Sequence, residues 1–194
     1  MKEAIVIGRP NVGKTLLTIN LAEFLGQRRV EVMFRPRDGA AYTRIYSIAQ
    51  ARADLVAETP HRTRCLQSLV LSVPRGKGVR KVVVTDTTGL CDEIHPSSAV
   101  RRAMADTIRS VARAVIILHV VDPLQPLSGV DLDILRFGQT QEGYALVANM
   151  MDLPGRAERL PELVRAARPA PVLAVSALKR TGLGEVRAFL RRHL

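Results

Sequence analysis

One octapeptide near the start of the chain restricts the possible folds more than any other feature. It reads Gly-Arg-Pro-Asn-Val-Gly-Lys-Thr over residues 8–15 and matches the pattern G-x-x-x-x-G-K-[ST]. The apolar stretch Ala4–Ile7 precedes it, and Lys14–Leu25, with apolar residues at helical spacing, follows it. Because a glycine-rich loop between a strand and a helix directs backbone amides at phosphate oxygens, the pattern predicts a phosphate-binding loop. The alternative is a glycine turn that only caps a helix.

The residue types in this loop specify the chemistry further. Lys14 is expected to reach the β- and γ-phosphates of a nucleotide, and the Thr15 hydroxyl is expected to ligate Mg²⁺. The remaining contacts are expected from backbone and side-chain groups of the loop. The expected phosphate-contacting residues are Gly8, Asn11, Val12, Gly13, Lys14 and Thr15.

A second phosphate-side element follows an apolar strand. Asp86-Thr87-Thr88-Gly89 comes directly after Val82–Thr85. A carboxylate at the end of a strand can hold Mg²⁺, and the Gly89 amide can approach a γ-phosphate. The alternative is that Asp86 is a helix cap or turn residue.

Two short segments farther along the chain predict a guanine site. Asn149-Met150-Met151-Asp152 follows the strand-like Tyr144–Ala148, and Ser176-Ala177-Leu178 follows the last predicted strand. The Asp152 carboxylate can accept from N1–H and the 2-amino group of guanine, which adenine does not offer in that arrangement, and the Ala177 amide can donate to guanine O6. The alternative for residues 149–152 is a plain turn after a strand.

Alternation of apolar strands and amphipathic helices predicts an α/β fold: a six-stranded, mostly parallel sheet with one antiparallel strand and helices on both faces. Residues 75–78 predict a hairpin turn. The predicted strands are Ala4–Ile7, Cys65–Val73, Val79–Thr85, Ala114–Val121, Tyr144–Ala148 and Pro171–Val175. The predicted helices are Lys14–Leu25, Ser98–Ala112, Asp131–Phe137, Glu158–Ala167 and Gly184–His193.

The segment between the first helix and the hairpin is too long for a structureless loop in a compact domain. Within it, Arg29–Phe34 can form a strand and Tyr42–Ala57 is predicted as a helix. Apolar residues would then lie near one helical face: Ile45, Ile48, Leu55 and Val56. We expect this insertion, at about residues 30–58, to be ordered and to face a partner. The alternative is that its apolar face packs on the domain itself.

Composition bounds the class of protein. The 194 residues include 29 Lys and Arg against 18 Asp and Glu, a net charge of +11, and 24 of the basic residues are arginines. This excess favours an RNA partner, because arginine binds phosphate bidentately; the alternative is arginine scattered over a solvated surface. The longest apolar runs are too short for a membrane span. Two cysteines fit a reducing compartment, so we expect a cytoplasmic protein. The length predicts one domain covering residues 1–194.

The ordered set GRPNVGKT, DTTGL, NMMD and SAL resembles the Era, TrmE and Der group of translation-factor-related GTPases with a Ras-like G domain. The resemblance covers essentially the whole chain and implies a stand-alone G domain that binds GTP or GDP with Mg²⁺. Two departures concern the site. Met150 stands where the group usually has lysine, and Thr88 stands where it usually has proline.

The resemblance also implies a switch mechanism. Thr63 best matches the switch I threonine that closes on Mg²⁺ and the γ-phosphate, with Thr59 as the alternative. Leu90 follows Gly89 where Ras-like enzymes often carry a glutamine, so intrinsic hydrolysis is expected to be slow. Asn11 corresponds to the residue that ligates a catalytic K⁺ in this group. The expected catalytic residues are therefore Lys14, Asn11 and Thr63.

Two alternatives to a GTP hydrolase stay open at the level of sequence. The first is a nucleotide-dependent binding module with negligible hydrolysis of its own. The second is an ATPase, which the carboxylate of Asp152 disfavours.

Overall fold

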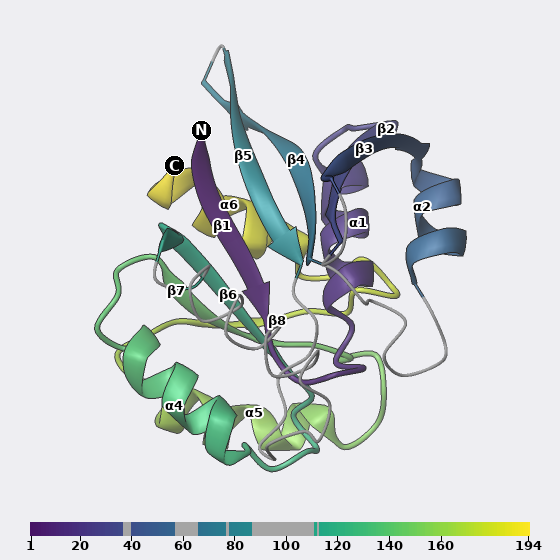
Figure 1. Ribbon diagram of the computed structural model, residues 1–194. Coiled ribbons are helices and arrows are strands. Elements are labelled where there is room, and N and C mark those ends of the chain that lie inside the picture. The colour runs from purple at the N-terminus through teal and green to yellow at the C-terminus, as the bar shows by residue number, and fades with distance from the viewer. Residues whose placement is uncertain (37–39, 57–65, 77, 87–110, 112) are drawn as a thin grey trace.

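The computed structural model describes residues 1–36, 40–56, 66–76, 78–86, 111 and 113–194, which form one mixed sheet covered by helices on both faces (Figure 1). Eight strands lie in the order β3-β2-β4-β5-β1-β6-β7-β8. Their bounds are β1 Lys2–Ile7, β2 Arg29–Arg35, β3 Tyr42–Ser47, β4 Leu66–Arg75, β5 Gly78–Asp86, β6 Ile116–Val121, β7 Tyr144–Ala148 and β8 Val172–Ala174.

The sheet has a parallel half and an antiparallel half. Strands β5, β1, β6, β7 and β8 run parallel to one another, which places their carboxyl ends at one edge. The strand β4 pairs antiparallel with β5, β2 with β4, and β3 with β2. The predicted α/β class is confirmed, but the prediction of six strands with one antiparallel member is wrong: the insertion adds two strands to the antiparallel edge.

Helices lie on both faces and bury two apolar clusters. They are α1 Lys14–Phe24, α2 Ile48–Leu55, α4 Gly129–Gly138, α5 Arg156–Ala167 and α6 Leu183–His193. The larger core joins α1, α2 and α6 to one face of the sheet, with Leu17, Ile48 and Leu190 among its buried members. The smaller core joins α4 and α5 to the other face through Leu135 and Leu163. The predicted helix Ser98–Ala112 lies outside the described residues, apart from Val111.

The predicted helix Tyr42–Ala57 is wrong in its first half. Residues Tyr42–Ser47 form the strand β3, and α2 begins only at Ile48. Aromatic and β-branched residues favour a strand here, and the register with β2 holds it in place. The Ser47 side chain accepts from the Gln50 amide while the Gln50 side chain accepts from the Ser47 amide, so this capping box begins the helix. Ile45 therefore lies on a strand, 70% exposed, and does not share a face with Ile48.

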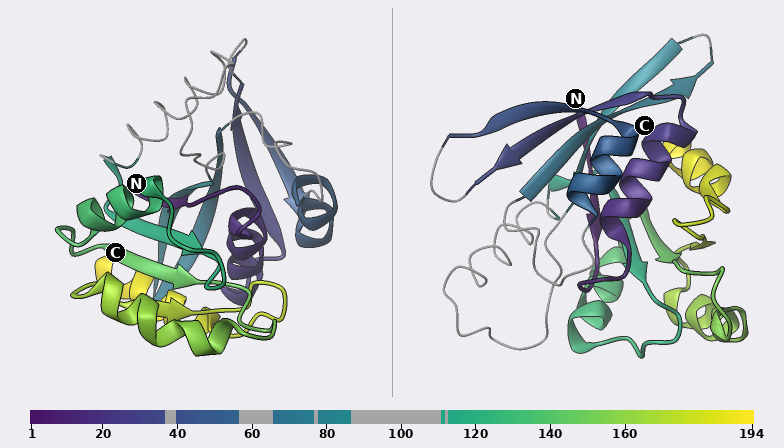
Figure 2. Two further views of the ribbon diagram at one scale, coloured as in Figure 1. Left: turned by 90° about the horizontal axis from the view of Figure 1, so that it is seen from below. Right: turned by 90° about the vertical axis from the view of Figure 1, so that its right-hand side faces the viewer.

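Strands β2 and β3 form a two-stranded arm whose far end extends away from α1 and α2 (Figure 2). We call this pair, Arg29–Arg35 with Tyr42–Ser47, the β2–β3 arm. The helix α2 follows β3 directly, and its Arg52 binds Glu23 of α1. Among the described residues, no helix is long and apolar enough to cross a membrane.

Candidate nucleotide-binding site

The loop between β1 and α1 has a backbone that requires glycine at two positions. Gly8 has φ 146°, and a Cβ there would lie 2.1 Å from the Val120 carbonyl oxygen. Gly13 has φ 88°, and a Cβ there would lie 2.4 Å from the Asn149 side-chain nitrogen. Each glycine therefore lets the loop approach a neighbouring strand end more closely than any side chain would allow.

Lys14 is the first residue of α1 and is buried, with 6% of its surface exposed. Its Nζ donates to the Arg9 carbonyl oxygen at 2.7 Å, so the ammonium lies within the turn of the loop. Asn11, at the exposed crest of the same loop, has φ 63°, a conformation that asparagine tolerates better than most residues. Lys14 and the amides that begin α1 thus form a cationic cradle of the kind that binds phosphate.

Thr15 and Asp86 meet beside this cradle. The Thr15 hydroxyl donates to Asp86 Oδ2 at 2.5 Å, and Asp86 is completely buried at the end of β5. Burial raises the pKa of Asp86 from 3.8 to about 6, although the charge of Lys14 and the Thr15 hydrogen bond lower it. Among the described residues, Asp86 Oδ1 has no hydrogen-bond partner. A buried, unpartnered carboxylate oxygen beside a hydroxyl is a donor set that fits Mg²⁺, which prefers oxygen ligands and retained waters.

Asn149 joins the loop to the predicted base-reading segments. The side chain is buried; its nitrogen donates to the Val12 carbonyl at 2.8 Å, and its oxygen accepts from the Ala177 amide at 2.9 Å. The amide that sequence reasoning assigned to guanine O6 therefore has Asn149 as its partner in this structure. Asn149 holds the phosphate loop and residues 176–178 at a fixed separation.

Asp152 and Ser176 lie together, as the guanine hypothesis requires. The buried Ser176 hydroxyl donates to Asp152 Oδ1 at 2.5 Å and accepts from the Lys179 amide at 2.9 Å. The hydroxyl orients a carboxylate that is itself exposed to solvent. Met150, with φ 61°, and Leu178, 63% exposed, lie on the same two loops. Both offer apolar surface next to this carboxylate.

A buried polar side chain that sequence reasoning missed supports the second of these loops. Asn20 of α1 donates to the Ala177 carbonyl at 2.6 Å and accepts from Arg52 Nε at 2.7 Å. It therefore connects the base-reading loop to α2 of the insertion. The only sequence signal for it is an asparagine between the apolar residues Ile19 and Leu21 of α1.

A second missed group is a buried network that begins at the phosphate loop. Arg9 Nε lies 3.1 Å from Asp131 Oδ2, and Asp131 Oδ1 lies 3.1 Å from His119, whose other ring nitrogen contacts the Tyr144 hydroxyl at 2.9 Å. Burial would raise the pKa of Asp131, but the hydrogen bonds from His119 and the Ser128 amide, with the charge of Arg9, lower it. Arg9 thereby fastens the loop to the start of α4.

Several predicted site residues lie outside the described part of the chain. They are Thr59, Thr63, Thr88, Gly89 and Leu90. The structure therefore brings together Lys14, Thr15 and Asp86 on the phosphate side, and Asn149, Asp152, Ser176 and Ala177 on the base side. Both switch segments stay predictions.

The fold and the loop between β1 and α1 define the class: an α/β P-loop protein with a G-domain fold. Residues 43–165 match the 50S ribosome-binding GTPase family. Because that match covers more than half of the chain, the chain belongs to this family. The predicted resemblance to the Era, TrmE and Der group is confirmed.

Curated relatives and solved structures agree with this assignment. The chain is 28% identical over 184 residues to the tRNA modification GTPase MnmE of Natranaerobius thermophilus, covering 95% of this chain and 32% of that protein. It is 26% identical over 190 residues to GTPase Der of Salmonella newport, covering 93% of this chain and 32% of that protein. The chain thus spans about a third of the length of these relatives.

The structure superimposes on that of Era in complex with MgGDPNP and nucleotides 1506–1542 of 16S ribosomal RNA. The TM-score is 0.69 at 21% identity, covering 100% of this chain and 56% of that one. This similarity shows the fold.

Proposed function

We propose that this chain is a single G domain that binds GTP and GDP with Mg²⁺ and hydrolyses GTP slowly, as a molecular switch. One observation carries the proposal: Lys14, Thr15 and the buried, unpartnered Asp86 oxygen converge beside the phosphate loop. Membership of a GTPase family supports the same activity. The MnmE, Der and Era proteins are named for such activities or bound to such nucleotides.

The phosphate side of the proposed reaction depends on the positive charge of Lys14 and on the amides of the phosphate loop. Loop amides and Lys14 would bind the β- and γ-phosphates and stabilise the charge that develops between them. Mg²⁺ would supply charge neutralisation at those oxygens, with Thr15 and Asp86 as the residues that hold it. Thr63, or alternatively Thr59, and the Gly89 amide would complete the site from the two switches.

The base side would distinguish guanine from adenine. Asp152, oriented by Ser176, would accept from N1–H and the 2-amino group of guanine. Met150 and Leu178 would cover the ring by apolar contact, in place of the lysine found in related sequences. Asn149 would keep this loop in register with the phosphate loop.

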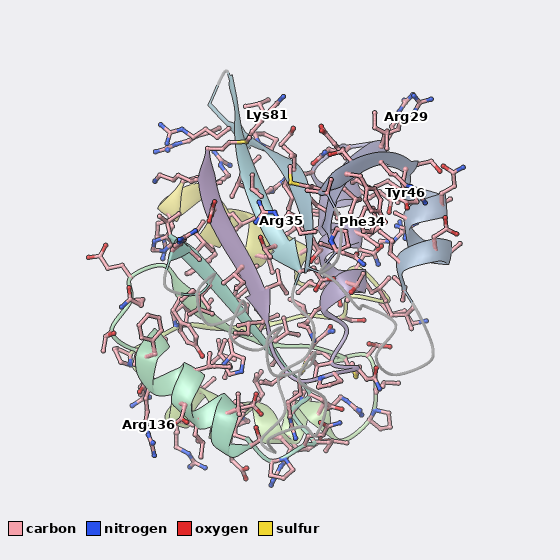
Figure 3. The ribbon with its side chains drawn as sticks, in the orientation of Figure 1. Arg29, Phe34, Arg35, Tyr46, Lys81 and Arg136 are labelled. Carbon is pink, nitrogen blue, oxygen red and sulfur yellow. The ribbon has the colours of Figure 1, made fainter. Side chains whose placement is uncertain are left out.

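RNA, alone or in the ribosome, is the proposed macromolecular partner, and the β2–β3 arm is the proposed contact surface. Tyr42 stacks on Phe34 at 5.0 Å between ring centroids, and the Arg44 guanidinium lies 5.4 Å from the Tyr42 centroid. Tyr42 is 44% exposed. Exposed aromatic rings with arginine are the groups on which unpaired bases stack. Figure 3 shows Phe34, Tyr46 and Arg29 together on this part of the sheet.

A nucleotide-exchange experiment tests the guanine assignment. Asp152→Asn should lower affinity for fluorescent GDP at least tenfold and raise affinity for the xanthosine diphosphate analogue, because an amide can donate to the xanthine oxygen. Lys14→Ala should weaken triphosphate binding more than it lowers the unfolding temperature of the nucleotide-free protein, in which Lys14 is bound to the Arg9 carbonyl. Unchanged GDP affinity in Asp152→Asn would contradict the base-reading role.

Single-turnover hydrolysis with protein in excess separates the switch enzyme from the alternative, a binding module that needs a partner for any hydrolysis. A measurable rate above that of buffer supports the enzyme. A rate equal to buffer, with nucleotide bound, supports the module.

A further inference from the structure

The strand β4 carries one buried polar residue in a row whose other buried members are apolar. Its core-facing residues Leu69, Leu71 and Val73 are all fully buried in the larger core. Gln67 occupies the same alternating row and is also buried, with 6% of its surface exposed. Among the described residues, its Oε1 has no hydrogen-bond partner. A buried, unsatisfied amide oxygen destabilises the fold, so its presence here calls for a function.

The strand register places Gln67 beside the proposed magnesium site. Gln67 lies directly opposite Asp86 of β5 and, on its other side, opposite Phe34 of β2. Directly opposed residues of antiparallel strands have Cβ atoms about 4.5–5.5 Å apart and point to the same face. Asp86 reaches from this face to the Thr15 hydroxyl. Gln67 is therefore a near neighbour of Asp86, the residue that binds the Thr15 hydroxyl.

Directly opposed residues thus carry two buried oxygens without donors, Gln67 Oε1 and Asp86 Oδ1. The Gln67 amide oxygen is an acceptor and never a donor, and Asp86 Oδ1 is likewise only an acceptor while the carboxyl group is ionised. Neither Thr15, which donates to the other Asp86 oxygen, nor the apolar Phe34 can satisfy them. Water molecules in the hydration shell of Mg²⁺ would supply donors to both, because Mg²⁺ keeps several waters when it binds proteins.

We propose that Gln67 is a positioning residue for Mg²⁺: with Asp86, it accepts hydrogen bonds from waters coordinated to the nucleotide-bound ion. The inference rests on the proposed function and adds to it a residue from β4, outside all the recognised sequence segments. Gln67 acts on the orientation of those waters and through them on the affinity for the ion.

Gln67→Met tests this role, because methionine keeps the unbranched shape and removes both polar atoms. Mg²⁺ is titrated into protein loaded with fluorescent GDP in excess EDTA. The variant should need about tenfold more free Mg²⁺ than the wild type, while its GDP affinity without Mg²⁺ stays within twofold. The unfolding temperature of its nucleotide-free form should rise, since an unsatisfied amide leaves the core.

Ser68→Ala is the matched control. Ser68 is the next residue of β4, points to the opposite face and shares a hydrogen bond of 3.1 Å with Thr85. It should leave the Mg²⁺ midpoint unchanged. If Gln67→Met does not fold, Gln67→Leu is measured in its place, with the same expected results.

The outcomes distinguish failure of the positioning role from failure of the proposed function. A wild-type Mg²⁺ response with an unchanged midpoint in the Gln67 variant would overturn the positioning role alone. Failure of the wild type to bind guanine nucleotide would overturn the proposed function and this inference with it. A shifted midpoint together with a higher unfolding temperature would support the role, because a purely structural residue changes stability without changing the midpoint.

Discussion

Asp86 lowers the free energy of unfolding when it is ionised, yet the proposed magnesium site needs its carboxylate. Because burial raises its pKa to about 6, the folded state holds its proton more tightly than the unfolded chain, where the pKa is about 3.8. The stability associated with the protonated form is present below about pH 4 and is lost as pH rises through 6. At pH 7.5 the ionised group therefore costs on the order of 2–3 kcal/mol.

We accordingly expect Asp86→Asn to raise the unfolding temperature of the nucleotide-free protein at pH 7.5. The gain should shrink between pH 6 and pH 4.5, where the wild-type carboxyl becomes protonated. Thermal unfolding followed by circular dichroism at several pH values is the measurement. Asp133→Asn is the control, since Asp133 is 77% exposed and, among the described residues, ion-paired only with Arg136. A pH-independent difference would show that the burial cost is not set by ionisation.

Asn11 is the residue through which a monovalent cation would act on GTP hydrolysis. Its exposed side chain stands at the crest of the phosphate loop, where an amide oxygen could ligate K⁺ beside the phosphates. GTP turnover should be faster in KCl than in NaCl at equal ionic strength, because the ion would stabilise charge developing between the β- and γ-phosphates. Asn11→Gly keeps the positive φ and removes the oxygen, so it should lose the difference. Potassium stimulation that survives in Asn11→Gly would remove Asn11 as a ligand of the ion, and equal rates in the two salts would favour a partner-supplied catalytic group.

At the scale of elements, the β2–β3 arm is the part of the insertion suited to bind RNA. We expect Tyr42→Ala and Arg44→Ala each to weaken binding of a single-stranded RNA oligonucleotide by roughly 5- to 100-fold, the loss associated with one stacked base. Fluorescence anisotropy measures the affinity. Arg136→Ala removes an equal charge from α4, away from the arm in Figure 3, and should change affinity little. Equal losses in Arg44→Ala and Arg136→Ala, with none in Tyr42→Ala, would instead indicate general charge attraction, and no loss in any variant would leave a protein as the partner of the arm.

The same elements show what the sequence could and could not predict. The glycine loop, the helix after it and Asp86 at the end of β5 follow from local pattern, because spacing along one strand or helix determines where those groups lie. The predicted helix Tyr42–Ala57 is wrong over β3, although Ser47 and Gln50 have the spacing of a capping box that begins a helix only at Ile48.

The base-side and core polar groups depend instead on which segments meet in the folded chain. Gln67 opposes Asp86 only through the β4–β5 register, and Asn20 reaches Ala177 across 157 positions of sequence. Nothing local to either residue distinguishes it from an ordinary buried amide. The contact of the Ala177 amide with Asn149 likewise follows from the approach of two loops that lie far apart in the chain.

Across the whole molecule, strand pairing and side-chain hydrogen bonds link the arm side to the nucleotide side. One row of directly paired residues crosses the antiparallel half of the sheet, from Tyr42 through Phe34 and Gln67 to Asp86. A second connection runs from the insertion through Arg52 and Asn20 to Ala177. The arm strand β2 is therefore paired with β4, which carries Gln67 of the proposed magnesium site. The insertion is also connected through Asn20 to Ala177 in the loop proposed to read the base.

The net charge of +11 makes salt dependence the decisive property of RNA binding for the molecule as a whole. Counterion release lowers log affinity linearly with log salt, with a slope of about −0.7 for each phosphate neutralised on a single strand. If the arm is the site, Arg44→Ala should make the slope shallower by about 0.7, whereas Arg136→Ala should leave it unchanged. The measurement is fluorescence anisotropy from about 50 to 300 mM KCl, which is on the order of one decade of ionic strength. It is made in the GDP- and GTP-bound states, with heparin as competitor. A steep slope that both variants reduce equally, identical in the two nucleotide states and abolished by heparin, would mean that the scattered arginines attract RNA without a defined surface, and the arm would then have no special part in binding.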